Sequence, residues 1–266
     1  MSPQRGFPYM RTASAALVAV LLAAPGAPAA PPAQGAPAAK PAPDPTAEEI
    51  VARYVTARGG MKKLAALKTL RQEGRINAGG GRDGLVMREI KRPGKIRFEF
   101  TVQGITSVFA SDGARGWKVN PLEGETSRQP LPEEALVDAR EQADIDGPLV
   151  DWKSKGSRIE LVGRETVGGH DAWKLKVTLK SGGILTAYVD VKSASLVRTE
   201  ATRLVRGKRV RIETTLGDYR KTEGILFPHL VEVRAAGRPQ VLRVVVDKIE
   251  VNPPLSDSRF APPAGS

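Results

Sequence analysis

The segment "KRPGKIRFEFTVQG", residues 91–104, decides the fold, because its side chains alternate between apolar and polar over most of its length. Ile96, Phe98, Phe100 and Val102 occupy every second position, and lysine, arginine, glutamate and threonine fill the positions between them. A period of two places all four apolar side chains on one face of a β-strand. The segment therefore predicts a strand in a sheet that has one apolar and one polar face.

The same period recurs on both sides of this segment. Further strands are predicted at residues 70–77, 85–90, 105–110, 116–120, 158–165, 172–180, 184–190, 195–206, 208–216, 225–234 and 240–251. Glycine-containing turns separate many of them at hairpin spacing, which is typical of an antiparallel meander of about twelve strands. The apolar face of such a sheet must be covered. The sheet can close around its own side chains, pack on another sheet, or curl into a half-barrel under helices.

Three helical segments interrupt or precede the strands. Thr46 and Glu49 form a capping-box pattern that starts a helix, which ends at two glycines, and residues 61–67 add one short turn. Residues 132–143 predict a third helix with a proline at its first position and acids in its first turn. Only two of these helical segments are available to cover the sheet and both are short, so either a fully packed core or a cavity partly covered by these helices can result.

The first 45 residues do not have the composition of a folded domain. Ala13–Ala24 is a short apolar run after a basic start, and small residues lead to a predicted cleavage site near Ala29. This pattern indicates a secretory signal peptide at residues 1–29, because the run is shorter than the roughly 20 residues that span a bilayer. An Ala/Pro-rich tether at 30–45, a single folded domain at 46–260 and a flexible tail at 261–266 are expected to follow.

Export and charge limit the choice of partners. The chain has no cysteine, which excludes disulfides and a lipid-modified amino terminus, and its formal net charge is +12. The basic residues are spread along the strands without a clustered footprint, so a nucleic-acid partner is not expected. An anionic membrane surface is the more plausible electrostatic partner. We expect a soluble protein of the periplasm, if the cell has two membranes.

The segment "EQADIDGPLVDWKSKG", residues 141–156, contains acids spaced as at the start of a calcium loop. If Gly147 takes the glycine position of such a loop, Gln142 and Lys153 fall where the first and last acidic ligands belong. The acids Asp144 and Asp146 are therefore expected to orient a turn. Leu149, Val150 and Trp152 in this segment can either lie on the sheet as part of a movable lid or plug the core permanently, and the sequence leaves both readings open.

No catalytic or metal-binding set is evident. The two histidines, His170 and His229, are too few for a metal site and fit surface or turn positions. Ser195 lies in no Gly-x-Ser-x-Gly elbow, and the adjacent acids Glu133 and Glu134 would diverge on a helix. We expect no enzyme activity, no cofactor and no metal.

Several segments, taken in their order along the chain, resemble the LolA-like family of bacterial outer-membrane lipoprotein-sorting proteins. They are "RYVTARGGMKKLAALKTLRQEGRI", "KRPGKIRFEFTVQG", "DGARGWKVNP", "EEALVDAREQADIDGPLVDWKSKG" and "LGDYRKTEGILFPH". The resemblance covers roughly residues 49–260. It implies a mainly β fold with some α-helix, in which a strongly curved antiparallel sheet of about 11–12 strands forms an unclosed β-barrel. Helices are expected to cover its concave face.

The resemblance also implies a carrier that holds acyl chains of a lipoprotein or lipid and moves them toward the outer membrane. An inner-membrane donor and an outer-membrane acceptor are then possible partners. The alternative is an envelope sensor or interaction module that binds the same signal without transporting it. From the apolar strand faces and the central helix, we expect the cavity and its lid to be formed by Phe98, Phe100, Val102, Phe109, Trp117, Leu136, Leu149, Val150, Trp152, Trp173 and Leu175.

Overall fold

A computed structural model describes residues 44–77, 79, 83–205 and 207–261. The predicted signal peptide, nearly all of the tether and the last five residues of the tail lie outside these ranges. The predicted helices are present as α1 (Ala47–Arg58), α2 (Met61–Ala65) and α3 (Glu133–Gln142). Two short 3-10 helices, η1 (Pro121–Glu123) and η2 (Asp257–Arg259), follow strand ends.

The capping box predicted for α1 is confirmed. The Glu49 amide donates to Thr46 Oγ1 at 3.2 Å, and the Thr46 amide donates to Glu49 Oε2 at 2.7 Å. Gly59 ends the helix with φ of 127°, a conformation that L side chains rarely adopt. At α3 the prediction needs one correction, because Pro132 is the residue before the helix and Glu133 is its first residue.

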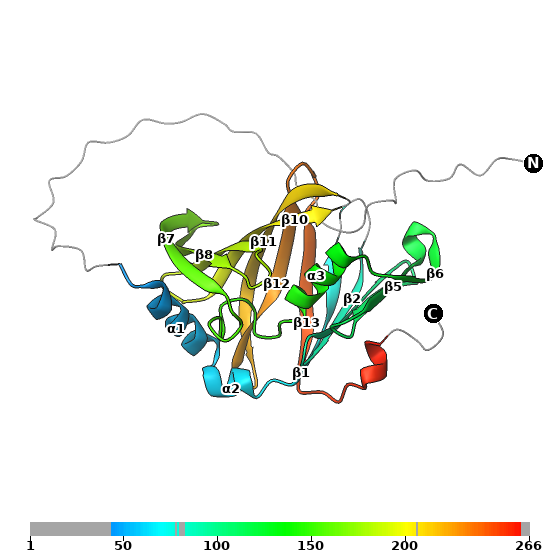
Figure 1. The fold of residues 1–266 in the computed structure, drawn as a ribbon, viewed down its shortest axis with the longest axis horizontal. Coiled ribbons are helices and arrows are strands. Elements are labelled where there is room, and N and C mark those ends of the chain that lie inside the picture. The colour runs from blue at the N-terminus through cyan, green and yellow to red at the C-terminus, as the bar shows by residue number, and fades with distance from the viewer. Residues whose placement is uncertain (1–43, 78, 80–82, 206, 262–266) are drawn as a thin grey trace, which may run out of the picture.

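Thirteen strands form a single antiparallel sheet in the described part of the chain (Figure 1). They are β1 (Thr69–Asn77), β2 (Asp83–Lys91), β3 (Lys95–Val102), β4 (Ile105–Ser111), β5 (Gly116–Asn120), β6 (Glu125–Pro130), β7 (Arg158–Val167), β8 (His170–Thr178), β9 (Ile184–Asp190), β10 (Leu196–Val205), β11 (Lys208–Thr222), β12 (Ile225–Ala235) and β13 (Leu242–Val251). The sheet does not close, since β6 and β7 are not paired with each other. The predicted unclosed barrel is confirmed.

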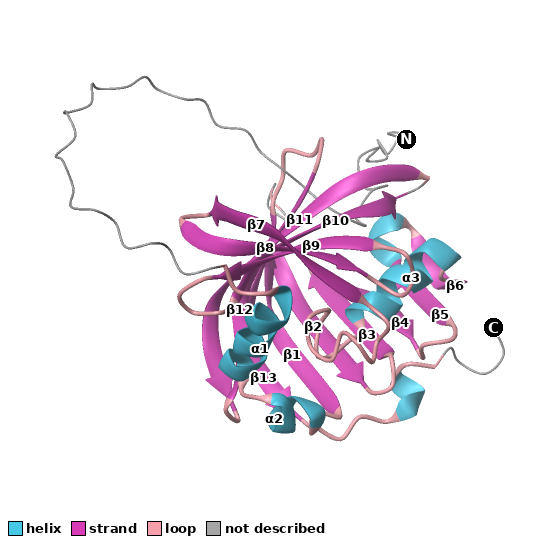
Figure 2. Cartoon of the chain, turned by 60° about the vertical axis from the view of Figure 1, so that its left-hand side comes forward, coloured by secondary structure: helices cyan, strands magenta, loops and turns pink. Residues whose placement is uncertain are grey.

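The strand order explains where the central segment runs. Reading across the sheet, the order is β6 to β1, then β13 down to β7, so β6 and β7 are consecutive in sequence but lie at opposite edges. The chain from Pro130 to Arg158 must therefore cross from one edge to the other. Figure 2 shows β7–β10 arching over the side of the sheet on which α1 and α3 lie. We call this side the inner face and residues 131–157 the crossing segment.

Two strands differ from the prediction. β6 was not predicted, because Thr126, Ser127 and Arg128 are polar and exposed, as an edge strand tolerates. β11 runs to Thr222, beyond the predicted end at Leu216, because Asp218 adopts a positive φ of 48° and lets the ladder continue.

The main core lies on the inner face and is built largely from β7–β13, α1 and α2. α1 contributes Ile50, Val51 and Tyr54, and Leu64 and Leu67 are fully buried after it. The opposite wall consists of the apolar sides of β8, β9, β12 and β13. This half of the inner face is therefore packed as a conventional core.

The outer face near β1–β5 is also covered, by residues 252–261 of the C-terminal segment. Phe260 is fully buried, and the Trp117 indole donates to the Ala261 carbonyl at 3.0 Å. The buried Glu89 carboxylate accepts from Arg71 and from Arg259, at 2.9 and 2.6 Å. These contacts give this end of the sheet a second apolar layer on the face opposite α3.

His229 lies at the end of the short ladder between β12 and β13. β12 and β13 pair over only Leu230–Val233 and Leu242–Val245. Below that ladder His229 Nδ1 donates to the Val246 carbonyl at 2.7 Å, and the side chain is buried. His229 was predicted to lie at the surface, and this was wrong, because its ring donates to a backbone carbonyl of the neighbouring strand and is buried there.

Candidate functional site

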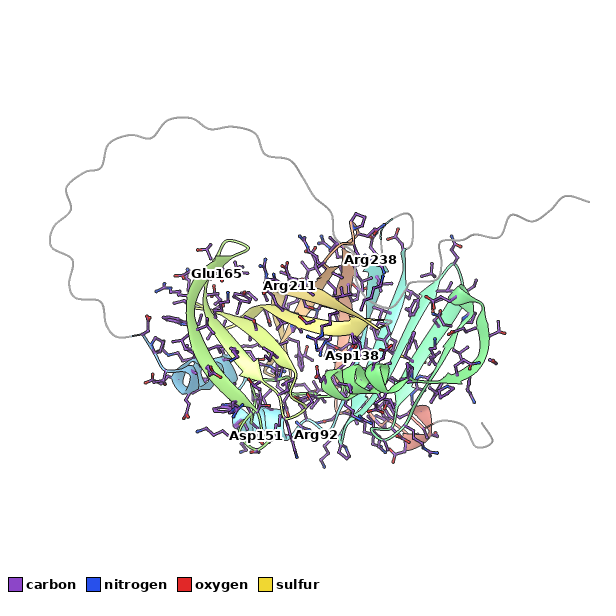
Figure 3. All side chains as sticks on the ribbon, turned by 45° about the horizontal axis from the view of Figure 1, so that its top comes forward. Arg92, Asp138, Asp151, Glu165, Arg211 and Arg238 are labelled. Carbon is purple, nitrogen blue, oxygen red and sulfur yellow. The ribbon has the colours of Figure 1, made fainter. Side chains whose placement is uncertain are left out.

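α3 lies between the two walls of the curved sheet. It contacts β3 and β4 on one side. On the other side Arg203 of β10 pairs with Asp138, at 3.5 Å, and with Glu141. Figure 3 shows Asp138 on α3 in the middle of the molecule, between the two wings of the sheet. Burial raises the pKa of the Asp138 carboxyl, and the Arg203 charge opposes that rise.

α3 packs on the sheet mainly through Leu136, which lies over Gly116 of β5. Leu136 is the only buried residue of the helix. A methyl group on Gly116 of β5 would come within 2.9 Å of Leu136 Cδ2 and 2.6 Å of Leu131 Cδ1. The absent side chain of Gly116 is thus what lets the helix approach the sheet so closely.

Replacing Gly116 by alanine is expected to lower the free energy of unfolding by about 1–2 kcal/mol, because two leucines and the helix must shift. Urea denaturation measures it. Gly217→Ala is the matched control, since the nearest atom to its added methyl group would lie 3.8 Å away. Equal unfolding free energies for the two variants would contradict the close packing of α3 on Gly116.

The second part of the crossing segment is fully packed. Ala143, Ile145, Leu149 and Val150 belong to the main core with α1, and Leu149 and Val150 are 0% and 1% exposed. Trp152 is half-buried against the same core. These residues occupy the packed half of the inner face, whereas α3 covers the other half only partly.

The acids in the packed part have protein partners. Asp146 accepts from Arg92 at 2.7 Å, and Arg92 also donates to the Leu67 carbonyl at 2.6 Å. Asp144 accepts from Lys155 at 2.7 Å. Figure 3 shows Arg92 and Asp151 at the same end of the molecule. Both acids are therefore bonded to basic side chains and orient the turn, which is the role expected for them.

Phe98, Phe100 and Phe109 form a connected, half-buried cluster on the inner face of β3 and β4. The Phe98 and Phe100 ring centroids are 6.3 Å apart, and those of Phe100 and Phe109 are 6.2 Å apart and stacked. Val102 lies on the same face and is also half-buried. We call these four residues the aromatic patch. α3 and the core leave this patch incompletely covered.

The other expected site residues are distributed over three places. Trp173 and Leu175 of β8 lie on the inner face within the packed core, together with Leu149 and Val150. Leu136 lies under α3. Trp117 lies on the outer face, because it is opposite Ala110 while Phe109 is opposite Lys118 in the same ladder. The expectation that Trp117 lines the inner face is corrected accordingly.

One inner-face residue was missed by the sequence analysis. Arg88 of β2 stands opposite Phe98 on β3 and opposite Gln72 on β1, so it shares the face of the aromatic patch. The signal was present in the sequence, since Arg88 takes the middle position of the alternation Val86, Arg88, Ile90. A charge at an apolar position of a strand calls for a specific explanation.

The described residues contain no group of three or more His, Cys, Asp or Glu side chains placed to hold a metal ion. In the same residues, no helix has both the length and the apolar character needed to cross a membrane. What the site provides is an apolar surface with two cations beside it, Arg88 opposite Phe98 and Lys118 opposite Phe109, of which Lys118 is paired with Glu125.

Comparison with solved structures identifies the fold. A LolA superfamily protein from Nitrosomonas europaea aligns with a TM-score of 0.53 at 13% identity, over 82% of this chain and 99% of its own. An outer membrane lipoprotein-sorting protein domain from Vibrio parahaemolyticus aligns with a TM-score of 0.51 at 10% identity, over 80% and 94% of the two chains. The chain has a LolA-like fold.

A DUF1329 family protein from Desulfovibrio piger shares the LolA-like fold, with a TM-score of 0.53 at 14% identity over 80% of this chain and 96% of its own. No protein-family profile and no curated protein sequence matches the chain. The LolA-like resemblance drawn from the sequence segments is thus confirmed by the fold, at identities that show the fold alone.

Proposed function

We propose that this protein binds an acyl chain of a lipid or lipoprotein on its inner face and carries it through the periplasm toward the outer membrane. The observation that carries the proposal is the aromatic patch, a connected set of half-buried apolar side chains beside the buried core. The bound chain lies over the patch, between β3, β4 and α3. No covalent chemistry is involved.

An apolar surface that is neither packed by the protein nor spread over its outside is suited to a hydrocarbon. Each methylene group removed from water contributes about 0.8 kcal/mol, so a C16 chain gains on the order of 10 kcal/mol before entropy and ordering costs. Flat phenyl rings supply this contact area without polar groups that need partners. The polar outer strand positions keep the loaded protein in solution.

The comparison with solved structures also supports the proposal, because one protein that shares the fold is an outer membrane lipoprotein-sorting domain. Acyl chains are the part of a lipoprotein that needs shelter in water, and the aromatic patch offers that shelter here. The leader predicted at residues 1–29 supports a periplasmic location.

Native mass spectrometry of protein purified from whole-cell lysate tests the binding step. We expect bound species with the masses of acylated lipids, and displacement of a fluorescent fatty acid by unlabelled palmitate. A protein that carries no lipid and binds no fluorescent fatty acid would rule out the proposal.

A transfer assay separates a carrier from a sensor. Donor vesicles with a radiolabelled lipoprotein are mixed with unlabelled acceptor vesicles, with and without the protein. A carrier increases the rate at which label reaches the acceptor vesicles. Lipid binding without any increase in that rate would replace the carrier by the sensor function.

A further inference from the structure

Arg88 is a cation placed beside the aromatic patch and facing the inside of the fold. Its nearest apolar neighbour in the register is Phe98, which stands directly opposite it on β3. The side chain is half-buried, and its Nε is buried without a hydrogen-bond partner. The guanidinium therefore sits at the boundary between the patch and the centre of the sheet.

The partners of Arg88 are neutral. Nη1 donates to Gln72 Oε1 at 3.4 Å, and Nη2 donates to the backbone carbonyl of Gln142, at the end of α3, at 2.6 Å. Among the described residues, no carboxylate forms an ion pair with it. Arg203, the other inner-face arginine beside α3, pairs with two. Burial alone lowers the pKa of Arg88, to about 10.

Such an arrangement is costly unless something else provides the negative charge. A buried charge that lacks an opposite charge destabilises the folded state, whereas neutral groups of similar volume fit the same space at little or no loss. The partial negative charge at the carboxyl end of α3 offsets only part of this. Arg88 thus has an unused Nε–H and an uncompensated charge on the surface where the acyl chain is proposed to lie.

We propose that Arg88 binds the oxyanion headgroup of the acyl ligand, a carboxylate or a phosphate, while the aromatic patch holds the chain. This assignment rests on the proposed function. The ligand is then an anionic amphiphile with its charge at Arg88 and its tail over Phe98, Phe100 and Phe109. The planar guanidinium suits two-point binding of either oxyanion.

Three ligands with the same C16 chain test the assignment: palmitate, hexadecyl phosphate and hexadecanol. Affinities are measured below their micellar concentrations by displacement of a fluorescent fatty acid. The wild-type protein is expected to bind at least one of the two anions about tenfold more tightly than the neutral alcohol. Preference for palmitate indicates a fatty-acid carboxylate, and preference for hexadecyl phosphate indicates a phospholipid-type headgroup.

In Arg88→Gln this preference should disappear while hexadecanol affinity changes by less than about threefold. Arg88→Lys should keep part of the preference, because it retains the charge without the planar fork. Arg53→Gln is the matched control, since it removes the same charge from an exposed position on α1. It should leave all three affinities unchanged.

Thermal melts separate the binding role from a structural one. If Arg88 only holds the end of α3, Arg88→Gln lowers the melting temperature and leaves the ratio of anion to alcohol affinity unchanged, which overturns the assignment. Equal affinity of the wild-type protein for all three ligands also overturns it, but leaves acyl binding intact. Binding of none of the three rejects the proposed function itself.

Discussion

Replacing Phe100 by asparagine is expected to weaken binding of a fluorescent C16 fatty acid by about 10- to 100-fold. Phe100 is the central ring of the aromatic patch, since it contacts both Phe98 and Phe109. An amide pressed against a hydrocarbon chain has no hydrogen-bond partner, which costs about 1–3 kcal/mol. Each 1.4 kcal/mol is a factor of ten in affinity.

Leu85→Asn is the matched control for this experiment. Leu85 is opposite Thr101, the residue next to Phe100, so it points to the outer face, where it is 63% exposed. Its replacement should leave fatty-acid affinity within about twofold, because nothing at the inner face changes. If the two variants lose affinity equally, or if neither does, the chain does not lie over the aromatic patch.

Replacing Leu149 by alanine is expected to lower the free energy of unfolding by about 2–5 kcal/mol, the range found for large-to-small changes in well-packed cores. Leu149 is completely buried in the same core as α1. Its removal leaves a cavity between the crossing segment and the sheet. Urea denaturation followed by circular dichroism gives the value.

The control for Leu149 is Leu204→Ala, at a position 48% exposed on β10. This change should alter stability by no more than about 0.5 kcal/mol. A loss below about 1 kcal/mol for Leu149→Ala, together with a change in fatty-acid affinity, would show that residues 143–150 lift away from the sheet as a lid. The packed position of Leu149 predicts the opposite result.

Most of the fold could be predicted because its signals are local. The alternation from Ile96 to Val102 defined both a strand and its inner face, and the Thr46–Glu49 pair defined the start of α1. Strand β6 gave no such signal, since it lies at an edge and has no apolar side chain to bury. Its pairing with β5 is visible only in three dimensions.

The site was harder to predict, because which face of a strand points inward is a property of the whole sheet. Trp117 is on an apolar side of β5, as expected, but that side is covered by Phe260 and the rest of the C-terminal segment. No feature near Trp117 in the sequence indicates this distant partner. Near β5 the outer face of the sheet is covered as well, so an apolar residue there does not define the inner face.

The sequence also did not distinguish the two parts of the crossing segment. The apolar residues of α3 and those around Leu149 are similar in the sequence, yet the structure places Leu149 in the core and leaves most of α3 half-buried. This difference in burial comes from the elements against which each part packs. Residues 143–150 pass beneath α1, whereas α3 lies over Gly116 and near the aromatic patch.

The position of β13 has a consequence for how the chain folds as it is synthesised. β13 pairs with β1 on one side and β12 on the other, although it is the last strand of the chain. Until it emerges, β1–β6 and β7–β12 are two separate sheets, each with a free edge beside an uncovered apolar face. The aromatic patch belongs to the first of these sheets, so it remains without its opposite wall until one strand joins the two halves.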